Sequence, residues 1–415
     1  MLVILKSGNM KEKETSIFNT NNKQTEYKLC DCCIRLVDDL AIKYKTKVEL
    51  VLTNTSTECY LCGNLFMEID KFTKLVLEKL DNYEYATFLI GLKTDDDLKE
   101  RTRQLWDTLF QGCMYDSDRD NPILEEIRSG IKRQIGKEIE KKTNKTVDFN
   151  NPDITAVVDA RYDIVELQIS PIYIYGRYLK LVRDIPQTKW DCRVCRGKGC
   201  ERCNGTGKMY PTSVEELIGE KILSLTKGKG TAFHGMGRED IDARMLGNGR
   251  PFIIEIVEPT VRTLDLKKIE NGINIDLAGK IEVHALKYAS KKDVVTIKNA
   301  KFDKTYMILV EFENHIDKEK IKEGVKIFKN TEINQHTPLR VKHRRADMCR
   351  KRKIIEMELD SVHDKTALLR IRSEGGTYIK ELIHGDDGRT QPNLSEILGT
   401  KCTVKELDVI KIHDQ

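Results

Sequence analysis

The chain has 415 residues, of which 71 are Lys or Arg and 66 are Asp or Glu, so the formal net charge is +5. With 33% charged and 39% hydrophobic residues, the composition is typical of soluble globular proteins and excludes a disordered or collagen-like chain. Apolar runs stay below the roughly 18–20 residues of a membrane span, and Met1–Leu5 is too short for a signal peptide. At about 150 residues per domain we expect two or three domains, in a monomeric cytoplasmic protein.

The first 70 residues hold the first of two cysteine-rich segments. Residues 7–27 are polar and aperiodic, which predicts an irregular loop. Two CxxC pairs then follow, separated by 25 residues: Cys30/Cys33 and Cys59/Cys62. Each pair brings two thiolates from one tight turn to the same ion, and two pairs complete a tetrahedral zinc site. Four thiolates leave no open position for a catalytic water, so we expect a structural zinc site in residues 1–70.

Residues 71–185 alternate between helical and extended periodicity. Apolar residues at helical spacing predict helices over Asp97–Phe110 and Ile123–Lys142. Short apolar runs predict three strands: Ile154–Val158, Ile164–Ile169 and Ile172–Ile174. The alternation predicts a modest α/β domain.

The second cysteine-rich segment, Cys192–Lys208, reads CRVCRGKGCERCNGTGK. Its glycines allow tight turns that point backbone N–H groups toward the thiolates. We therefore expect a zinc site at residues 192–203 and one or two structural zinc ions in total; the ligands here would be Cys192, Cys195, Cys200 and Cys203. Disulfides fit less well, because the chain lacks a secretion signal. The remaining cysteines are expected to be ordinary thiols: Cys32, Cys113, Cys349 and Cys402.

Residues 186–415 predict an α+β domain with a large, mostly antiparallel mixed sheet. Its first helix begins at Ser213, which forms a capping box with Glu216. One apolar face of that helix is predicted to contain Val214, Leu217, Ile218, Ile222 and Leu225. Strand-like runs follow: Pro251–Val257, Val294–Ile297, Met307–Phe312, Lys353–Leu359, Ala367–Ile371 and Thr403–Ile412.

Two segments of this domain concentrate charge. Pro338–Lys353 reads PLRVKHRRADMCRKRK, which suits either a polyanion or a solvated strand face. Gly235–Phe252 alternates acids with arginines, which predicts either a ligand-binding loop or a salt-bridged surface loop. Composition alone does not decide between these alternatives.

The segment GREDIDARMLGNGRPF, residues 237–252, resembles the active-site loop of the tRNA pseudouridine-54/55 synthases of archaea and eukaryotes, the tenth family of such synthases. Those enzymes carry one essential aspartate after a Gly-Arg-x pattern, and Gly237–Asp240 matches it residue by residue. Lys304–Tyr306 resembles the segment that supplies the active-site tyrosine. Gly376–Lys380 resembles the third motif, although TruB-type enzymes have Arg where this chain has Lys380.

The resemblance covers nearly the whole chain and is strongest from Arg177 to the end. RYLKLVRDIPQTKW, residues 177–190, and the second cysteine-rich segment are similar to the archaeal branch. The α/β part, which ends in NPDITAVVD and DIVELQI, resembles a THUMP RNA-binding domain. The implied organisation is a zinc-binding segment at 1–70, a THUMP-like domain at 71–185 and a catalytic domain at 186–415.

The resemblance implies an isomerase that converts uridine to pseudouridine in the T-loop of tRNA, at positions 54 and 55. Asp240 would be the catalytic carboxylate, acting either as a nucleophile or by removing a ribose proton. Substrate contacts are expected from Tyr306, Tyr378, Lys380, Arg238, Arg244 and Arg250. Lys380 would stand beside Asp240, and Tyr306 would offer a flat face to the uracil. The reaction neither gains nor loses atoms, so we expect no catalytic cofactor.

Two other functions remain open from the sequence. A metal-dependent RNA nuclease would use Glu239, Asp240 and Asp242 as Mg²⁺ ligands, although the interleaved arginines would compete for those carboxylates. A non-catalytic zinc-containing RNA-binding protein would share the cysteine pairs and the basic segment but leave every uridine unchanged.

Overall fold

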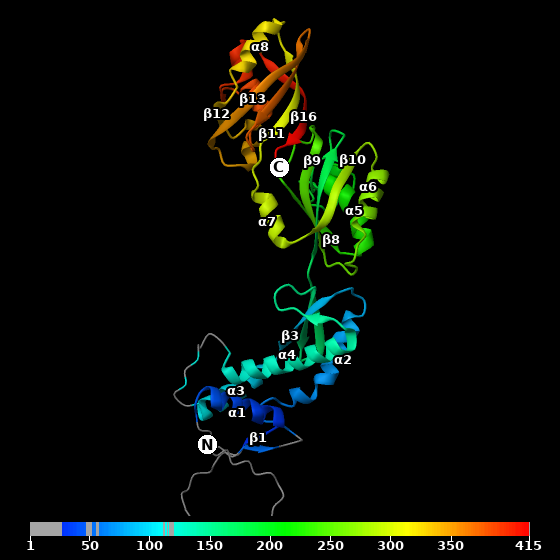
Figure 1. The fold of residues 1–415 in the computed structure, drawn as a ribbon, viewed down its shortest axis with the longest axis vertical. Helices are drawn as coiled ribbons and strands as arrows, with labels where there is room; N and C mark the ends of the chain where they lie inside the picture. The colour runs from blue at the N-terminus through cyan, green and yellow to red at the C-terminus, as the bar shows by residue number, and fades with distance from the viewer. Residues whose placement is uncertain are drawn as a thin grey trace, which may run out of the picture. The chain divides into compact units, whose positions relative to one another are not determined.

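The computed structural model describes residues 27–46, 52–54, 58–110, 113, 115 and 120–414 (Figure 1). The loop predicted over residues 7–27 lies outside this range, except for Tyr27. The chain divides into two compact units, Met1–Ser170 and Pro171–Gln415. Within the described ranges, each helix is either too short or too polar to cross a membrane.

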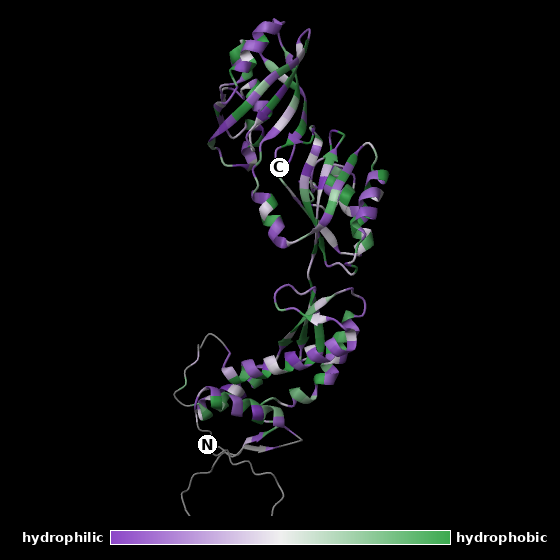
Figure 2. Cartoon of the chain, viewed as in Figure 1, coloured by the Kyte–Doolittle hydropathy of each residue, from purple (hydrophilic) through white to green (hydrophobic). Residues whose placement is uncertain are grey.

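The long helices of the first unit pack around the longest of them, α4 (Figure 1). They are α1 (Asp31–Lys43), α2 (Ile69–Leu80), α3 (Asp96–Leu109) and α4 (Pro122–Thr143), and the predictions for α3 and α4 are confirmed. Asn121 begins α4 by accepting a hydrogen bond from the Leu124 backbone N–H at 3.1 Å. Isoleucines at every fourth position then face the core: Ile123, Ile127, Ile131, Ile135 and Ile139. Hydrophobic and hydrophilic positions alternate along α4 in Figure 2.

A small mixed sheet completes the first unit. Its strands are β3 (Thr87–Lys93), β4 (Thr146–Val147), β5 (Ile154–Asp159) and β6 (Ile164–Ile169), in the order β4-β3-β5-β6. The β3 strand is parallel to β4 and β5, whereas β5 and β6 are antiparallel. Near the cysteine pairs, β1 (Tyr27–Leu29) and β2 (Leu52–Asn54) form a separate parallel pair.

The cysteine pairs of the first unit belong to the same hydrophobic core as its helices and sheet. Cys33 and Leu61 are fully buried in the cluster that also contains Phe72 and Ile131. The packing therefore runs across residue 70, where the sequence predicted a boundary. The second unit also begins earlier than the predicted residue 186, because β7 (Ile172–Lys180) pairs with strands of the second unit.

A ten-stranded sheet dominates the second unit. The strands after β7 are β8 (Gly230–Gly235), β9 (Arg244–Val257), β10 (Ile281–Ala289), β11 (Lys304–Phe312), β12 (Thr331–His336), β13 (Cys349–His363), β14 (Thr366–Ser373), β15 (Thr390–Gln391) and β16 (Cys402–Ile412). Their order is β10-β7-β9-β16-β11-β14-β13-β12-β15, and β8 pairs with β9. Among the described strands of this sheet, only β9 and β16 pair in parallel, which confirms the predicted mostly antiparallel sheet.

The helices of the second unit are α5 (Val214–Thr226), α6 (Leu266–Asp276), α7 (Lys291–Asn299), α8 (Lys318–Lys326), α9 (Ile379–His384) and α10 (Leu394–Leu398). The predicted N-cap of α5 is present, because Ser213 Oγ accepts from Glu216 N at 3.2 Å. The Glu216 carboxylate accepts from the Ser213 hydroxyl, not from its backbone N–H, so only half of the predicted capping box is formed. Leu225 is 46% exposed, so its predicted place on the buried face is wrong. The strand predicted at Val294–Ile297 is also wrong, since a Ser290–Asp293 capping box begins α7 there.

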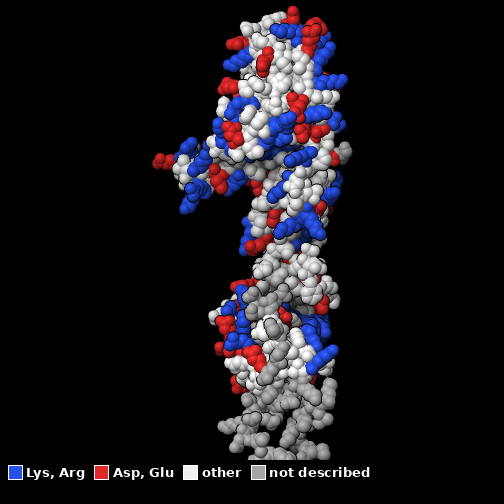
Figure 3. Space-filling view, turned by 90° about the vertical axis from the view of Figure 1, so that its left-hand side faces the viewer, with Lys and Arg blue, Asp and Glu red and all other residues white. Residues whose placement is uncertain are grey.

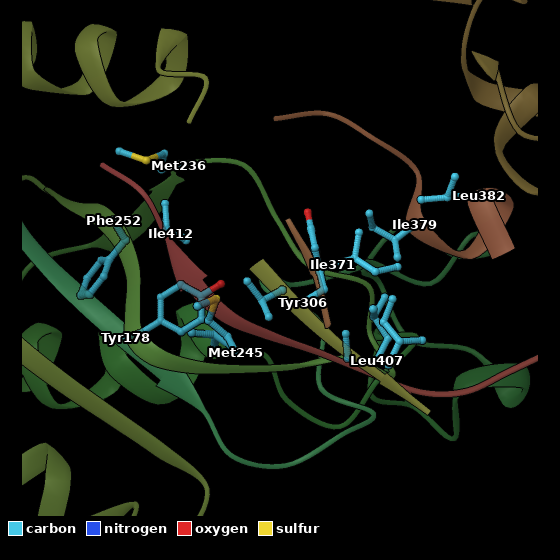
Figure 4. Close-up of a cluster of buried hydrophobic side chains, with 14 of the residues drawn as sticks. Tyr178, Met236, Met245, Phe252, Tyr306, Ile371, Ile379, Leu382, Leu407 and Ile412 are labelled. Carbon is cyan, nitrogen blue, oxygen red and sulfur yellow. The ribbon is translucent and has the colours of Figure 1, made fainter. Parts of the chain in front are cut away.

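The β9–β16 pairing joins the two halves of the sheet over one continuous core. Tyr306 of β11 lies between Met245 of β9 and Ile371 of β14 in this core (Figure 4). The loop predicted over Gly235–Phe252 is shorter than expected, because β9 already begins at Arg244. Residues 236–243, here called the Asp240 loop, thus connect β8 to β9 close to the junction of the two halves.

Candidate active site

A buried lysine holds the Asp240 loop in place. Lys180, the last residue of β7, is fully buried and donates hydrogen bonds to three backbone carbonyls. The acceptors are Ile185 at 2.8 Å, Ile241 at 3.0 Å and Asp240 at 3.3 Å. Burial lowers the pKa of Lys180, and the Glu239 carboxylate 3.9 Å away opposes that effect. Lys180 therefore ties the segment after β7 to the Asp240 loop.

Glu239 is the acid at the centre of the same buried network. Its carboxylate accepts a hydrogen bond from the Tyr178 hydroxyl at 2.9 Å and another from Arg250 Nε at 2.8 Å. Arg250 also donates to the Met236 carbonyl at 2.8 Å. Burial, and then the negative charge of Glu239, raises the pKa of Tyr178 well above its usual value, so the hydroxyl remains a donor. These buried contacts hold Met236 and Glu239 of the Asp240 loop in place.

Two cations face the Asp240 carboxylate, whose side chain is one-third exposed. Arg340 Nη1 donates to Oδ1 at 3.2 Å, and Lys380 Nζ lies 3.5 Å from Oδ2. Lys380 is closer to Asp242, at 2.7 and 2.9 Å, than to Asp240. Arg340 is itself fixed by the buried Glu381, which accepts from Nε at 2.7 Å. The sequence predicted Lys380 beside Asp240, but the shorter contact comes from Arg340.

A cavity of about 520 Å³ opens over Asp240. Six of the seven residues expected to act on substrate line it: Asp240, Tyr306, Tyr378, Lys380, Arg238 and Arg250. Its apolar lining includes Ile379 and Leu407, which lie near Tyr306 in Figure 4. A smaller cavity of about 210 Å³ adjoins Asp240 as well and is lined by Trp190 and Arg340 among others. The Asp240 carboxylate is thus exposed to a partly apolar space large enough for a flipped nucleobase.

The two tyrosines occupy different settings within the cavity. Burial raises the pKa of Tyr306 to about 12, so its hydroxyl stays protonated and its ring offers a flat apolar wall. The Tyr378 hydroxyl accepts a hydrogen bond from Arg345 Nη1 at 2.7 Å. The Arg340 guanidinium lies 6.0 Å from the Tyr378 ring centroid. Tyr378 therefore links the cavity to the basic segment that follows β12.

The three arginines expected to touch substrate have different environments. Arg238 is exposed at the cavity. Arg250 is only 1% exposed and bonds within the protein, so it does not fit the expected role of a substrate contact. Arg244 forms a bidentate pair with Asp408, at 3.1 and 2.5 Å, and does not line the cavity. The charges of Arg250 and Arg244 are already compensated within the protein, so both arginines stabilise the strands around the loop.

The same geometry disfavours a magnesium site. Glu239, one of the three expected carboxylate ligands, is turned into the core and engaged by Arg250 and Tyr178. Asp242 is engaged by Lys380. Within the described part of the chain, the only clusters of three or more potential metal ligands are the two cysteine groups.

Each cysteine group consists of the four predicted thiols, with ligand atoms within 4.8 Å of one another. In the first group, the Cys30 backbone N–H donates to Cys59 Sγ at 3.3 Å. In the second, Gly199 and Gly207 donate to the sulfurs of Cys195 and Cys203 at 3.2 Å each. Such N–H donors stabilise thiolates, and the all-sulfur donor set suits zinc. Cys32 is outside the first group, as the sequence predicted.

Comparison with known proteins assigns the chain to a family. The family described as "Pus10, C-terminal" matches residues 173–413, and "Pus10 THUMP domain, archaeal" matches residues 72–159. The chain belongs to the Pus10 family. The first Pus10 match covers nearly all of the second unit, and the THUMP match lies within the first unit.

Pus10 relatives align over most of the chain. A protein of Methanothermobacter marburgensis named "tRNA pseudouridine synthase Pus10" is 42% identical over 94% of this chain and 96% of its own length. A protein of the same name from Methanosphaera stadtmanae is 39% identical over 97% and 99%. A third, from Methanothrix thermoacetophila, is 41% identical over 89% and 79%. The fold and domain types implied by the Pus10 resemblance are therefore confirmed.

The site contains residues that sequence reasoning did not single out. Arg340 was only one of eight cations in the basic segment, and Lys180 and Tyr178 were noted only as part of a similar stretch. Lys180 stands among apolar residues in RYLKLV, beyond the strand predicted at Ile172–Ile174, and an isolated cation in such an apolar run could have indicated a buried partner. No neighbouring residue indicated that Arg340 belongs to the site, because its partner Asp240 is 100 residues away in the sequence.

Proposed function

We propose that this protein is a tRNA pseudouridine synthase that isomerises uridine in the T-loop, at positions 54 and 55. The observation that carries the proposal is Asp240, held between two cations at the wall of a cavity that Tyr306 lines. Full-length similarity to proteins named as such synthases supports it. A nuclease is not favoured, because Glu239 is occupied within the core.

Different residues would act on the sugar and on the base of the target uridine. Coulomb attraction to Arg340 and Lys380 stabilises the charge of the Asp240 carboxylate, which would act at the ribose of the target uridine. The target base must leave its stack, which costs a few kcal/mol. The ring of Tyr306 and the apolar side chains of Ile379 and Leu407 would receive it and exclude water.

Exposed cations near the site would contact the RNA backbone. Four residues of the second cysteine-rich segment are exposed and form no ion pair among the described residues: Arg193, Arg196, Lys198 and Arg202. Lys and Arg side chains gather on the second unit in Figure 3, interspersed with fewer acids. Unpaired cations gain most from a phosphate backbone, since no internal partner must be displaced. The THUMP-like part would bind RNA as well.

Mapping of pseudouridine in an unmodified tRNA transcript tests the proposed function. Incubation with the purified protein is expected to produce pseudouridine at positions 54 and 55 and nowhere else in the T-loop. A short incubation with EDTA is expected to leave the yield unchanged, because the chemistry needs no free metal ion. A transcript that is bound but keeps every uridine would contradict the proposal, and RNA cleavage that EDTA abolishes would favour a nuclease.

We also propose that both cysteine groups hold structural zinc. Metal analysis is expected to find two zinc ions per chain. Cys33→Ser, at a fully buried thiol, should remove one ion and lower the melting temperature of the first unit by roughly 10 °C, because the metal stabilises only the folded state. Cys349→Ser is the matched control, since this exposed thiol belongs to neither group. Full zinc content in Cys33→Ser would contradict the assignment.

A further inference from the structure

Lys304 is a cation that lines the cavity and has no role in the proposed reaction so far. It is the first residue of β11 and lies two positions before Tyr306, on the same side of the strand, and both residues line the 520 Å³ cavity. Its ammonium donates one long hydrogen bond, to the Phe302 carbonyl at 3.3 Å. Among the described residues no carboxylate forms an ion pair with it. Lys380 and Arg340, two other cations that line the cavity, each have an acidic partner.

The charge of Lys304 is poorly compensated inside the protein. Burial, and then the positive charge of Arg250, lowers the pKa of Lys304 to about 8. Asp303, the acid that opposes this effect, is engaged by Arg372 of β14 at 3.2 Å. A half-buried ammonium with one weak acceptor favours any ligand that brings oxygen atoms into the cavity.

We propose that the Lys304 ammonium donates a hydrogen bond to a carbonyl oxygen of the target uracil and stabilises the negative charge that the base acquires when it is detached. This inference rests on the proposed function. The C1′–N1 bond breaks and its electron pair leaves with the uracil, where the charge is shared among N1 and the two carbonyl oxygens. The C1′–C5 bond then forms, C5 loses a proton and N1 gains one, so atoms and electrons balance. The ammonium keeps its proton throughout, and its hydrogen bond strengthens as the charge develops.

Substitution by methionine tests this role, because methionine has a similar length but no charge. The single-turnover rate of pseudouridine formation in Lys304→Met is expected to fall by about 100-fold, as for the loss of one donor to a developing negative charge. The dissociation constant for tRNA should change by less than about 3-fold, since the contact strengthens only during reaction. Lys301→Met is the matched control at an exposed lysine outside the cavity, and its rate should stay within about 3-fold of wild type.

A pH profile separates this role from a purely structural one. The wild-type single-turnover rate should fall as the pH rises through about 8, because Lys304 then loses its proton. Lys304→Arg keeps its charge at that pH, so it should lack this fall and retain at least about a tenth of the wild-type rate. The charged or titratable groups next to Lys304 include Arg250 from β9, Asp303, Arg372 from β14 and His413, which bonds Thr305; Asp240 and Tyr306 line the same cavity. Burial lowers the pKa of His413 below its usual value and raises the pKa of Tyr306 to about 12, so neither group accounts for a fall near pH 8.

Three results would overturn the inference: a wild-type rate in Lys304→Met, an equal loss in Lys304→Met and Lys304→Arg, or an unchanged fall near pH 8 in Lys304→Arg. These outcomes differ from a failure of the proposed function. If the wild-type protein forms pseudouridine and Asp240→Asn does not, but Lys304→Met matches wild type, only the role of Lys304 is wrong. If the wild-type protein forms no pseudouridine at all, the proposed function itself is wrong.

Discussion

Asp240→Asn is expected to slow pseudouridine formation in tRNA by about 10⁴-fold or more. The asparagine amide has nearly the same shape as the carboxylate and can still accept a hydrogen bond from Arg340. It carries no negative charge, however, and can neither attack the ribose nor remove a proton from it. Losses of this size are typical when an enzyme loses its only nucleophile or base. Single-turnover assays with a T-loop transcript measure the effect.

Two further measurements separate a loss of catalysis in Asp240→Asn from a loss of folding or of tRNA binding. Because the Asp240 side chain is one-third exposed and lies above the buried network, Asp240→Asn should keep its melting temperature within about 2 °C of wild type. Its affinity for tRNA should be similar to that of wild type. Asp360→Asn, which removes an acid of β13 paired with Arg370 of β14, serves as a matched control and should retain full activity, because neither residue lines the cavity. An Asp240→Asn protein with more than a tenth of the wild-type rate would place the chemistry at another residue.

Glu239→Gln is expected to destabilise the second unit by about 3–5 kcal/mol, the usual cost of leaving a buried charge without its partner. Arg250 is only 1% exposed and Lys180 is fully buried, and both depend on the Glu239 carboxylate. Glutamine keeps the size of the side chain but removes the charge that compensates them. The melting temperature of the second unit should therefore fall by about 10 °C.

Differential scanning calorimetry with a matched surface variant measures this prediction. Glu311→Gln removes an acid that pairs with Lys405 in solvent, where both side chains are more than 40% exposed. Its effect should be below about 1 kcal/mol. Glu239→Gln should also slow pseudouridine formation at temperatures where it remains folded, because the Asp240 loop rests on this network. A loss of stability no larger than that of Glu311→Gln would show that the buried cations are compensated in another way.

The amino-acid sequence determined those features that depend on neighbouring residues. The CxxC spacing identified both cysteine groups, since each pair is a single turn. Apolar periodicity located α3 and α4, and periodicity together with the capping residue Ser213 located α5. The prediction failed at Val294–Ile297, where four consecutive β-branched residues resemble a strand, although the capping box at Ser290 begins a helix. The Gly-Arg-Glu-Asp motif singled out Asp240 only through resemblance to a family.

The tertiary structure alone decided what surrounds Asp240. Glu239 and Asp240 are adjacent in the chain, yet one carboxylate is directed into the core and the other toward the cavity. Lys180 of β7 and Arg340, from the segment after β12, come to the Asp240 loop from distant parts of the chain, and their partners were not visible in the pattern of nearby residues. Lys304 of β11 lines the same cavity. The physical reason is that charge compensation depends on distance in space. A buried cation is stable only where the fold supplies an acid or a carbonyl, and these partners can lie far away along the sequence.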